Sequence, residues 1–197
     1  MFYQRLRELW RESFSKELKE IWNQRLIEWR RDGAVIRIVR PTRLDRARAL
    51  GYRAKQGILL ARVRVLRGGR KRRGSLKKGR RSKNARAKKI VDINYQTVAE
   101  QRANKKFKNC EVLNSYYVGK DGKYMFYEVI LIDRDHPQIL NDKQLSGVAG
   151  RKGRVFRGLT ASGKRSRGIL THKGKGAEKL RPSRAAHIRR RYARPRK

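Results

Sequence analysis

VLNSYYVGKDGKYMFYEVILI, residues 112–132, is the stretch of this 197-residue chain that decides its fold. β-Branched and aromatic residues, which favour strands, dominate the runs from Val112 to Val118 and from Tyr124 to Ile132. Lys120-Asp121-Gly122-Lys123 separates the two runs, and an Asp-Gly pair in that position is a strong hairpin signal. The sequence therefore predicts an antiparallel β-hairpin, and we expect the hydrophobic core to form around it.

A helix is predicted immediately before the hairpin. Thr97-Val98-Ala99-Glu100 has the pattern of a capping box, in which Thr97 and Glu100 satisfy free backbone N–H groups at a helix start. We expect this helix to run to about Lys108.

A third strand is predicted earlier in the chain, because residues from Ile58 to Arg67 alternate between apolar and basic. One face would carry Leu59, Ala61, Val63 and Val65, and the other would carry Arg62 and Arg64. We expect the apolar face to pack in the core and the arginine face to contact solvent or phosphate.

The N-terminal segment carries an apolar stripe with the three- and four-residue spacing of a helix. The stripe consists of Phe2, Leu6, Leu9, Trp10, Phe14, Leu18, Ile21, Trp22, Leu26 and Trp29. Ser13 and Ser15 interrupt it, so we predict two helices broken near Ser13, with Gly33 as the stop. An amphipathic membrane anchor is the alternative, but the interspersed glutamates would face anionic lipid unfavourably. Packing of the tryptophans in the core is therefore the favoured interpretation.

Between these helices and the first predicted strand lies a short apolar stretch, Val35 to Val39, followed by a basic helix. Thr42 can cap the start of this helix together with Asp45, three residues later, and Gly51 can end the helix.

The predicted fold class is α+β: a small antiparallel sheet with a helix on one face, an N-terminal helical segment, a long basic loop and a basic C-terminal extension. The expected divisions are 1–56, a core at 57–142 interrupted by the loop 67–92, and the extension 143–197.

Charge is strongly segregated along the chain, whose formal net charge is +40. Residues 46–91 contain 19 Lys and Arg and no Asp or Glu, and residues 143–197 contain another 19 against the single Glu178. Such tracts repel themselves and become compact only against a polyanion, which indicates nucleic acid. The tract that opens at Gly68 has almost nothing apolar to bury, so we expect it to be disordered without a partner.

Several other function classes find no support in the sequence. No apolar run approaches the roughly 20 residues of a membrane span, and the start lacks a secretory signal, so we expect an intracellular protein. The single cysteine, Cys110, excludes a multi-cysteine zinc site and is expected to be a buried thiol near a helix end. A metal-dependent nuclease would need clustered carboxylates, and the candidates here are Asp133, Asp135 and His136. Because they lie just before Pro137, where Asp and His commonly form turns, we expect a structural role for them.

The segment from Gly158 to Lys164 matches the spacing of a phosphate-binding P-loop until Arg165 replaces the hydroxyl residue that would bind magnesium. It also lacks the required preceding strand, so nucleotide hydrolysis is not predicted. Its backbone N–H groups and basic neighbours could instead approach nucleic-acid phosphates.

RNA is favoured over DNA as the partner. The sequence has no zinc-finger spacing, basic zipper or helix-turn-helix, and it lacks the aromatic signature of an RNA-recognition motif. Long Gly-punctuated basic arms on a small fold suit the crevices of a large folded RNA. A DNA-compacting chromosomal protein is the alternative, although it would typically require a dimer scaffold or a minor-groove wedge.

Five segments resemble the L15e family of the large ribosomal subunit in archaea and eukaryotes. They are Arg40 to Arg48, Leu50 to Gly57, Arg64 to Arg72, Val112 to Gly119 and Arg157 to Gly168, in the family's order and spread over most of the chain. The resemblance implies an α+β domain with extensions and a structural, non-catalytic protein embedded in the subunit. The implied partners are large-subunit ribosomal RNA and neighbouring ribosomal proteins, in the cytoplasm, with no membrane, small-molecule substrate, cofactor, metal site or catalytic residue.

The expected RNA-binding residues are basic residues selected by charge and placement. They are Arg43, Arg46, Arg48, Arg53, Lys55, Arg62, Arg64, Arg67, Arg70, Lys71, Arg72, Arg73, Arg157, Lys164, Arg165, Arg167 and Arg184. Tyr52, Tyr116 and Tyr117 could stack on bases, but packing within the fold is the favoured role for these tyrosines.

Overall fold

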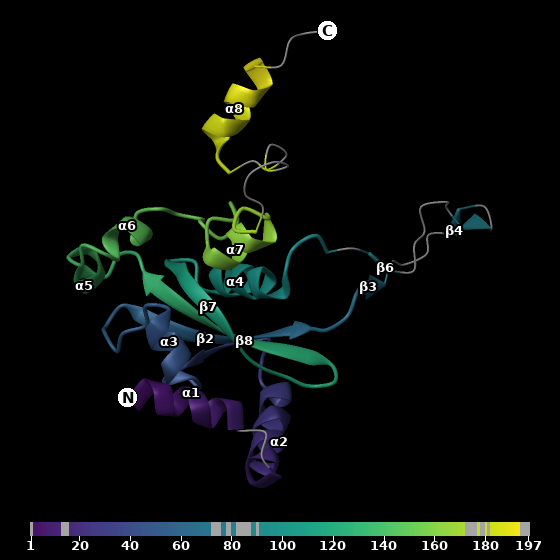
Figure 1. The fold of residues 1–197 in the computed structure, drawn as a ribbon, viewed down its shortest axis with the longest axis vertical. Helices are drawn as coiled ribbons and strands as arrows, with labels where there is room; N and C mark the ends of the chain where they lie inside the picture. Colours follow the sequence, from purple (N-terminus) through teal and green to yellow (C-terminus); the bar gives the residue numbers. More distant parts are fainter. Residues whose placement is uncertain are drawn as a thin grey trace.

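The computed structural model describes residues 2–12, 16–71, 76–77, 80–81, 88–89, 91–171, 177, 180 and 182–193. At its centre lies an antiparallel sheet with strand order β1-β2-β8-β7, where the strands are β1 (Val35–Ile38), β2 (Ile58–Leu66), β7 (Cys110–Lys120) and β8 (Tyr124–Asp133). The helices are α1 (Phe2–Glu12), α2 (Lys16–Arg31), α3 (Leu44–Ala49), α4 (Tyr95–Lys106), α5 (Pro137–Leu140), α6 (Ser146–Ala149), α7 (Ala161–Ser166) and α8 (Arg184–Ala193). Helices cover both faces of the sheet (Figure 1).

The predicted hairpin is confirmed as β7 and β8, which pair from Cys110–Asp133 to Lys120–Met125. Asp121 closes the turn: its Oδ1 accepts hydrogen bonds from the backbone N–H groups of Lys123 at 2.7 Å and Tyr124 at 2.5 Å. Gly122 does not adopt a positive φ. The aspartate side chain therefore defines this turn more than the freedom of the glycine does.

One face of the sheet packs against α4, as the alternation in β2 predicts. Ala61, Val63 and Val65 are buried there against Ala99 and Ala103 of the helix. The hairpin contributes Val112, Val129 and Leu131 to the same cluster. The small alanines on α4 let the helix approach the sheet closely, so this face forms a tightly packed core.

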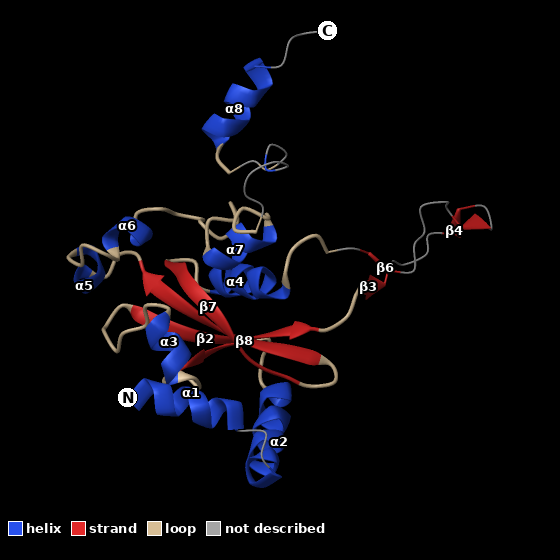
Figure 2. Ribbon diagram, viewed as in Figure 1, coloured by secondary structure: helices blue, strands red, loops and turns tan. Residues whose placement is uncertain are grey.

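The opposite face is also covered, which the sequence analysis did not anticipate. Leu26 and Trp29 of α2 and Ala47 of α3 pack there with Leu60, Phe126 and Ile130 of the sheet. Figure 2 shows α1, α2 and α3 together on this side, across the sheet from α4 and α7. The apolar stretch at Val35 forms the short edge strand β1, which extends the sheet beside β2.

The tryptophans join the N-terminal helices to this face, which confirms their predicted packing role. Trp10, Trp22, Trp29 and Phe126 form a series of edge-to-face contacts, with ring centroids 5.6, 5.5 and 5.2 Å apart in that order. This geometry is favoured by the ring quadrupoles. The predicted pair of helices is present as α1, ending at Glu12, and α2, beginning at Lys16, while the break near Ser13 itself lies outside the described residues.

Both predicted capping boxes are wrong. The N-cap of α4 is Asn94, whose side chain accepts from the Thr97 backbone N–H. Thr42 does not cap α3; it donates from its backbone N–H and its hydroxyl to the carboxylate of Glu128. Thr42 and Glu100 thus form tertiary hydrogen bonds, to Glu128 and from Thr160, instead of capping a helix start.

Among the described residues, three glutamates are buried, and each accepts hydrogen bonds from a segment beyond its own element. Glu128 accepts from Thr42 and from the Tyr116 hydroxyl. The two other carboxylates contact the segment after α6: Glu100 accepts from the Thr160 hydroxyl at 2.6 Å, and Glu111 accepts from the Gly153 N–H at 2.6 Å. Burial raises the pKa of the Glu100 and Glu128 carboxyls above the ordinary 4.5, although these hydrogen bonds oppose the shift.

The basic loop leaves the sheet after β2 and extends to one side of the molecule (Figure 1). Its described parts form two short antiparallel ladders, β3 (Arg70–Lys71) with β6 (Lys88–Lys89) and β4 (Leu76–Lys77) with β5 (Arg80–Arg81). The prediction of disorder for this tract falls largely outside the described residues. None of the helices in the described part of the chain is long and apolar enough to cross a membrane.

The contact between α2 and β7 predicts a large effect of Gly119→Ala. A methyl group on Gly119 would lie 2.6 Å from Cζ2 of Trp22. Because the ring is held by its aromatic neighbours, we expect the free energy of unfolding to fall by about 1–3 kcal/mol. Gly122→Ala is the matched control, since a methyl group there meets no atom within 4 Å. Urea unfolding of both full-length variants measures the difference, and equal midpoints would contradict the proposed tight contact.

Burial of Glu100 predicts how stability depends on pH. Its pKa is raised in the folded protein, so at neutral pH the fold carries the cost of a buried charge, and that cost disappears as pH falls through the raised pKa toward 4.5. Glu100→Gln lacks this cost at every pH. We expect wild type to gain stability relative to the variant as pH is lowered from neutrality, measured by urea unfolding at each pH. A stability difference that stays constant with pH would count against this account.

Candidate nucleic-acid interface

Arg62 of β2 faces the protein rather than an open surface, which corrects, for this residue, the expectation of an arginine face in contact with solvent or phosphate. Arg62 lies 2.6 Å from Oδ2 of Asp32, and its guanidinium stacks 4.5 Å from the centre of the Trp29 ring. Its side chain is only 15% exposed. Helix α2 covers this face, so an ion pair and a stacking contact hold Arg62 within the fold.

Two neighbouring arginines have comparable roles. Arg64 lies over the Tyr124 ring at 4.7 Å and donates a hydrogen bond to the Arg30 carbonyl. Arg67 donates to the Asp121 carbonyl in the hairpin turn. Both side chains therefore tie β2 to its surroundings, and any contact with RNA would add to these bonds.

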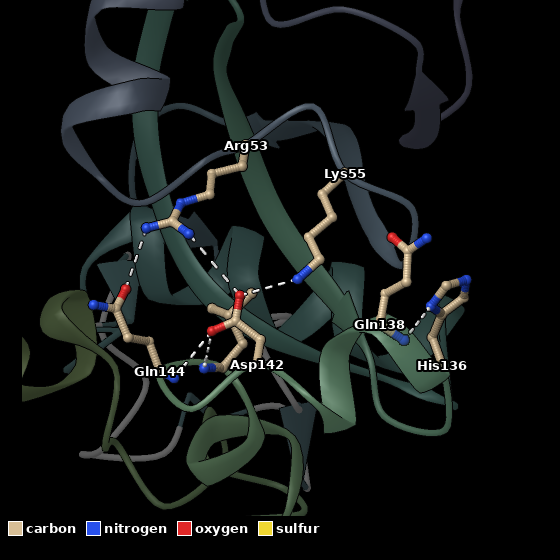
Figure 3. Close-up of polar contacts among 7 residues, drawn as sticks. Arg53, Lys55, His136, Gln138, Asp142 and Gln144 are labelled. Carbon is tan, nitrogen blue, oxygen red and sulfur yellow. Dashed lines mark hydrogen bonds and ion pairs between the residues drawn. The ribbon is translucent and has the colours of Figure 1, made fainter.

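Arg53 and Lys55 share one carboxylate (Figure 3). Lys55 Nζ lies 3.1 Å and Arg53 Nη1 lies 3.9 Å from Oδ2 of Asp142, and Arg53 also donates to the Gln144 side chain at 3.3 Å. The hydrogen bond from Lys55 lowers the pKa of the Asp142 carboxyl. These contacts fasten the segment before β2 to the loop after α5, while 57% of the Arg53 side chain stays exposed.

The basic residues around α3 differ in how much they are held by the protein. Arg43 pairs with Asp45 at 3.1 Å and lies over Trp10 at 5.0 Å. Arg46 and Arg48 are exposed. The helix itself is anchored by Ala47, which is fully buried. Helix α3 thus presents two arginines outward from a firmly packed base.

The P-loop-like segment forms a compact turn that continues into α7. Thr160 caps this helix by accepting from the Gly163 N–H at 3.1 Å. Gly158 has φ +63°. A methyl group added to Gly163 would lie 2.7 Å from the Cα atom of Gly158. The two glycines are therefore needed because the backbone packs closely here. The Gly163 N–H at the start of the helix already donates to the Thr160 hydroxyl.

Cations around this turn include three exposed residues, Arg157, Lys164 and Arg165. Arg167 is turned inward and donates to the Gly158 carbonyl at 3.3 Å. For Arg70 and Lys71 the structure describes only the backbone, Arg72 and Arg73 lie outside the described residues, and Arg184 is described only as part of α8.

The structure also brings together residues that are distant in sequence, in a cleft of about 510 Å³ beside the edge strand β7. Three predicted residues line it: Arg43, Arg46 and Arg165. Arg7 of α1 lines it as well, and sequence reasoning missed this residue. Arg7 lies outside the apolar stripe of the first helix, and the packing of α1 against α3 brings it to the cleft.

The residues considered for nuclease chemistry form a turn, as predicted. Asp133 Oδ1 accepts from the Asp135 N–H at 3.2 Å, and His136 caps α5 by accepting from the Gln138 N–H at 3.3 Å (Figure 3). Within the described ranges, no group of three or more His, Cys, Asp or Glu side chains could hold a metal ion. Cys110 is buried at the start of β7, and burial raises the pKa of its thiol to about 11, which makes it unreactive.

Comparison with known proteins identifies the class. The relatives found include a protein from Methanocella arvoryzae that is 49% identical, over 95% of this chain and 96% of the relative. A protein from Methanocorpusculum labreanum is 47% identical over 94% of this chain and 95% of the relative. One from Methanospirillum hungatei is 46% identical over 92% of this chain and 93% of the relative. Each is named large ribosomal subunit protein eL15, so the class is that of large-subunit ribosomal proteins. The family model described as Ribosomal L15 matches residues 1–187. The chain belongs to this ribosomal L15 family.

Family membership confirms the function predicted from the sequence: a structural constituent of the large ribosomal subunit, without an enzymatic role. It also confirms the resemblance seen in the five segments, and the structure itself confirms the α+β fold class. The comparisons give no support to the DNA-compacting alternative.

The different environments of two arginines predict different effects of their removal. Arg62→Ala breaks the ion pair with Asp32 and the stacking on Trp29, so we expect the free energy of unfolding to fall by about 1–3 kcal/mol. Arg48→Ala removes the same charge from an exposed helical position, and we expect a change within about 0.5 kcal/mol. Thermal or urea unfolding of both variants tests this. Equal losses would show that Arg62 is not a structural residue.

Proposed function

We propose that the chain binds and stabilises folded large-subunit ribosomal RNA through its basic extensions and the exposed cations of its core. The observation that carries this proposal is the placement of charge. Glu100, Glu111 and Glu128 are at most 2% exposed, so their side chains do not offset the basic surface at close range. The outer surface is therefore more strongly basic than the composition alone indicates, and it suits a phosphate backbone.

The exposed arginines and lysines would act by displacing counterions from RNA phosphates. Candidates on the described core are Arg46, Arg48, Arg157, Lys164 and Arg165. Arg70, Lys71, Arg72 and Arg73 in the loop and Arg184 in the C-terminal extension are further candidates by charge. Arg43, Arg53, Lys55, Arg62, Arg64, Arg67 and Arg167 would contribute mainly by fixing the shape of the surface, since each already bonds within the protein.

Neighbouring large-subunit proteins are the second class of partner in this proposal, within ribosomes of the cytoplasm. Support comes from α1, where Phe2, Tyr3 and Leu9 are exposed. Apolar side chains gathered on one short helix suit a protein surface better than a phosphate backbone.

Sedimentation of a cell lysate tests the proposed function. At low salt we expect the chain to migrate with large ribosomal subunits, to resist moderate salt, and to leave that position after nuclease treatment. A loosely held basic protein would instead lose about three to five decades of affinity over such a salt range. Migration with chromosomal DNA, or at the top of the untreated gradient, would contradict the proposal.

A further inference from the structure

The cleft beside β7 is built from five elements. α1 and α3 form one wall, α4 and α7 form the other, and β7 forms the floor as the outermost strand of the sheet. The floor is protected: Gln96 of α4 donates to the Ser115 carbonyl at 2.8 Å, and Asn114 accepts from the Ser115 N–H at 3.0 Å. The edge strand is thus closed to pairing with another strand at Ser115, and the cleft presents side chains instead.

Three exposed arginines approach the cleft from different elements: Arg7 from α1, Arg46 from α3 and Arg165 from α7. Among the described residues that line the cleft, Asp45 is the only acidic one. Convergent guanidinium groups from separate helices form a typical phosphate-binding arrangement, because each offers several N–H donors to oxygen.

Two buried polar atoms in the lining residues have no hydrogen-bond partner in the described structure. Asp45 is 3% exposed and pairs with Arg43 through Oδ2, but its Oδ1 is unsatisfied. Nε of Arg43 is unsatisfied as well. Stacking on Trp10 helps to fix the Arg43 guanidinium. A buried acceptor and a buried donor are thus unsatisfied on paired side chains that line the cleft, and a ligand group that can both donate and accept would satisfy both.

We propose that this cleft binds a single unpaired nucleotide of RNA. Its phosphate would lie among Arg7, Arg46 and Arg165, and its ribose 2′-hydroxyl would donate to Asp45 Oδ1 while accepting from Arg43 Nε. The 2′-hydroxyl is both donor and acceptor and is absent from DNA. A volume of about 510 Å³ suits one small ligand and is too small for a duplex.

This inference rests on the proposed function and adds to it a site that distinguishes RNA from DNA. Tyr117 lines the floor and contacts Tyr127 edge-to-face, with ring centroids 5.9 Å apart, and its exposed part would be available to the base. The remaining basic surface of the protein would bind phosphates of either nucleic acid. Preference for ribose would therefore come from this cleft.

Asp45→Asn gives the decisive test. Binding of the full-length chain to a single-stranded RNA octamer and to the DNA octamer of the same sequence is measured by fluorescence anisotropy at several salt concentrations. We expect wild type to prefer RNA and the variant to bind RNA about tenfold more weakly, with DNA binding unchanged or tighter. General electrostatics predicts the opposite for RNA, because the variant gains one positive charge.

Matched controls separate the site from the overall charge. Asp135→Asn makes the same charge change at an exposed position in the turn before α5. Arg165→Gln in the cleft is compared with Arg157→Gln, which is also exposed but does not line the cleft. We expect Arg165→Gln to reduce RNA affinity more than Arg157→Gln does. This second pair keeps the test valid if thermal unfolding shows that Asp45→Asn disturbs the fold.

The outcomes are distinguishable. Equal RNA and DNA affinity of wild type, or cleft variants that behave like their controls, would overturn the nucleotide site while leaving the proposed function intact. Wild-type chain that neither binds RNA nor sediments with large subunits would contradict the proposed function itself.

Discussion

Hydrogen bonds to buried glutamates of the sheet and of α4 connect the strongly basic segments to the core. Glu128 in β8 accepts from Thr42, just before α3, and Glu100 and Glu111 accept from Thr160 and Gly153 in the C-terminal extension. Because segments of high positive charge repel one another, attachment to carboxylates inside the core offsets part of that repulsion. The burial of each carboxylate is costly, and the raised pKa values of Glu100 and Glu128 reflect this cost.

The same arrangement determines how charge is distributed. A carboxylate on the surface would weaken attraction to RNA, whereas a buried carboxylate holds a loop in place and is partly shielded from the RNA. Asp142 is the contrasting case, since it binds Arg53 and Lys55 near the surface and neutralises part of their charge there. The chain therefore combines a fold that needs acids with a surface that is mainly basic.

Much of the fold could be predicted because strong local signals coincide with tertiary structure. The hairpin, the alternation in β2 and the tryptophan stripe all reflect periodicities that burial imposes. The two capping boxes failed because a threonine followed by an acid is equally suited to a tertiary hydrogen bond, as Thr42 and Glu100 show. Edge strand β1 spans only Val35–Ile38, so its apolar pattern was too short to assign.

Prediction of the interface was limited by a different cause. Alternation shows which side chains share a face of a strand, but not whether another layer covers that face. Arg62 and Arg64 were therefore assigned to solvent or phosphate, although Arg62 lies against Trp29 of α2 and Arg64 lies over the Tyr124 ring. The cleft beside β7 depends on elements brought together from both ends of the chain, and no local pattern contains that information.

The contrast between Arg62 and Arg46 shows why composition alone does not locate a nucleic-acid surface. Both arginines belong to the acid-free tract 46–91. Arg62 is nevertheless paired and stacked within the fold, whereas Arg46 is exposed beside a cleft. Guanidinium groups suit both environments, because their planar faces stack on aromatic rings and their edges bind carboxylates or phosphates. Stacking on aromatic rings, together with pairing to carboxylates or carbonyls, therefore marks the arginines that hold the fold together.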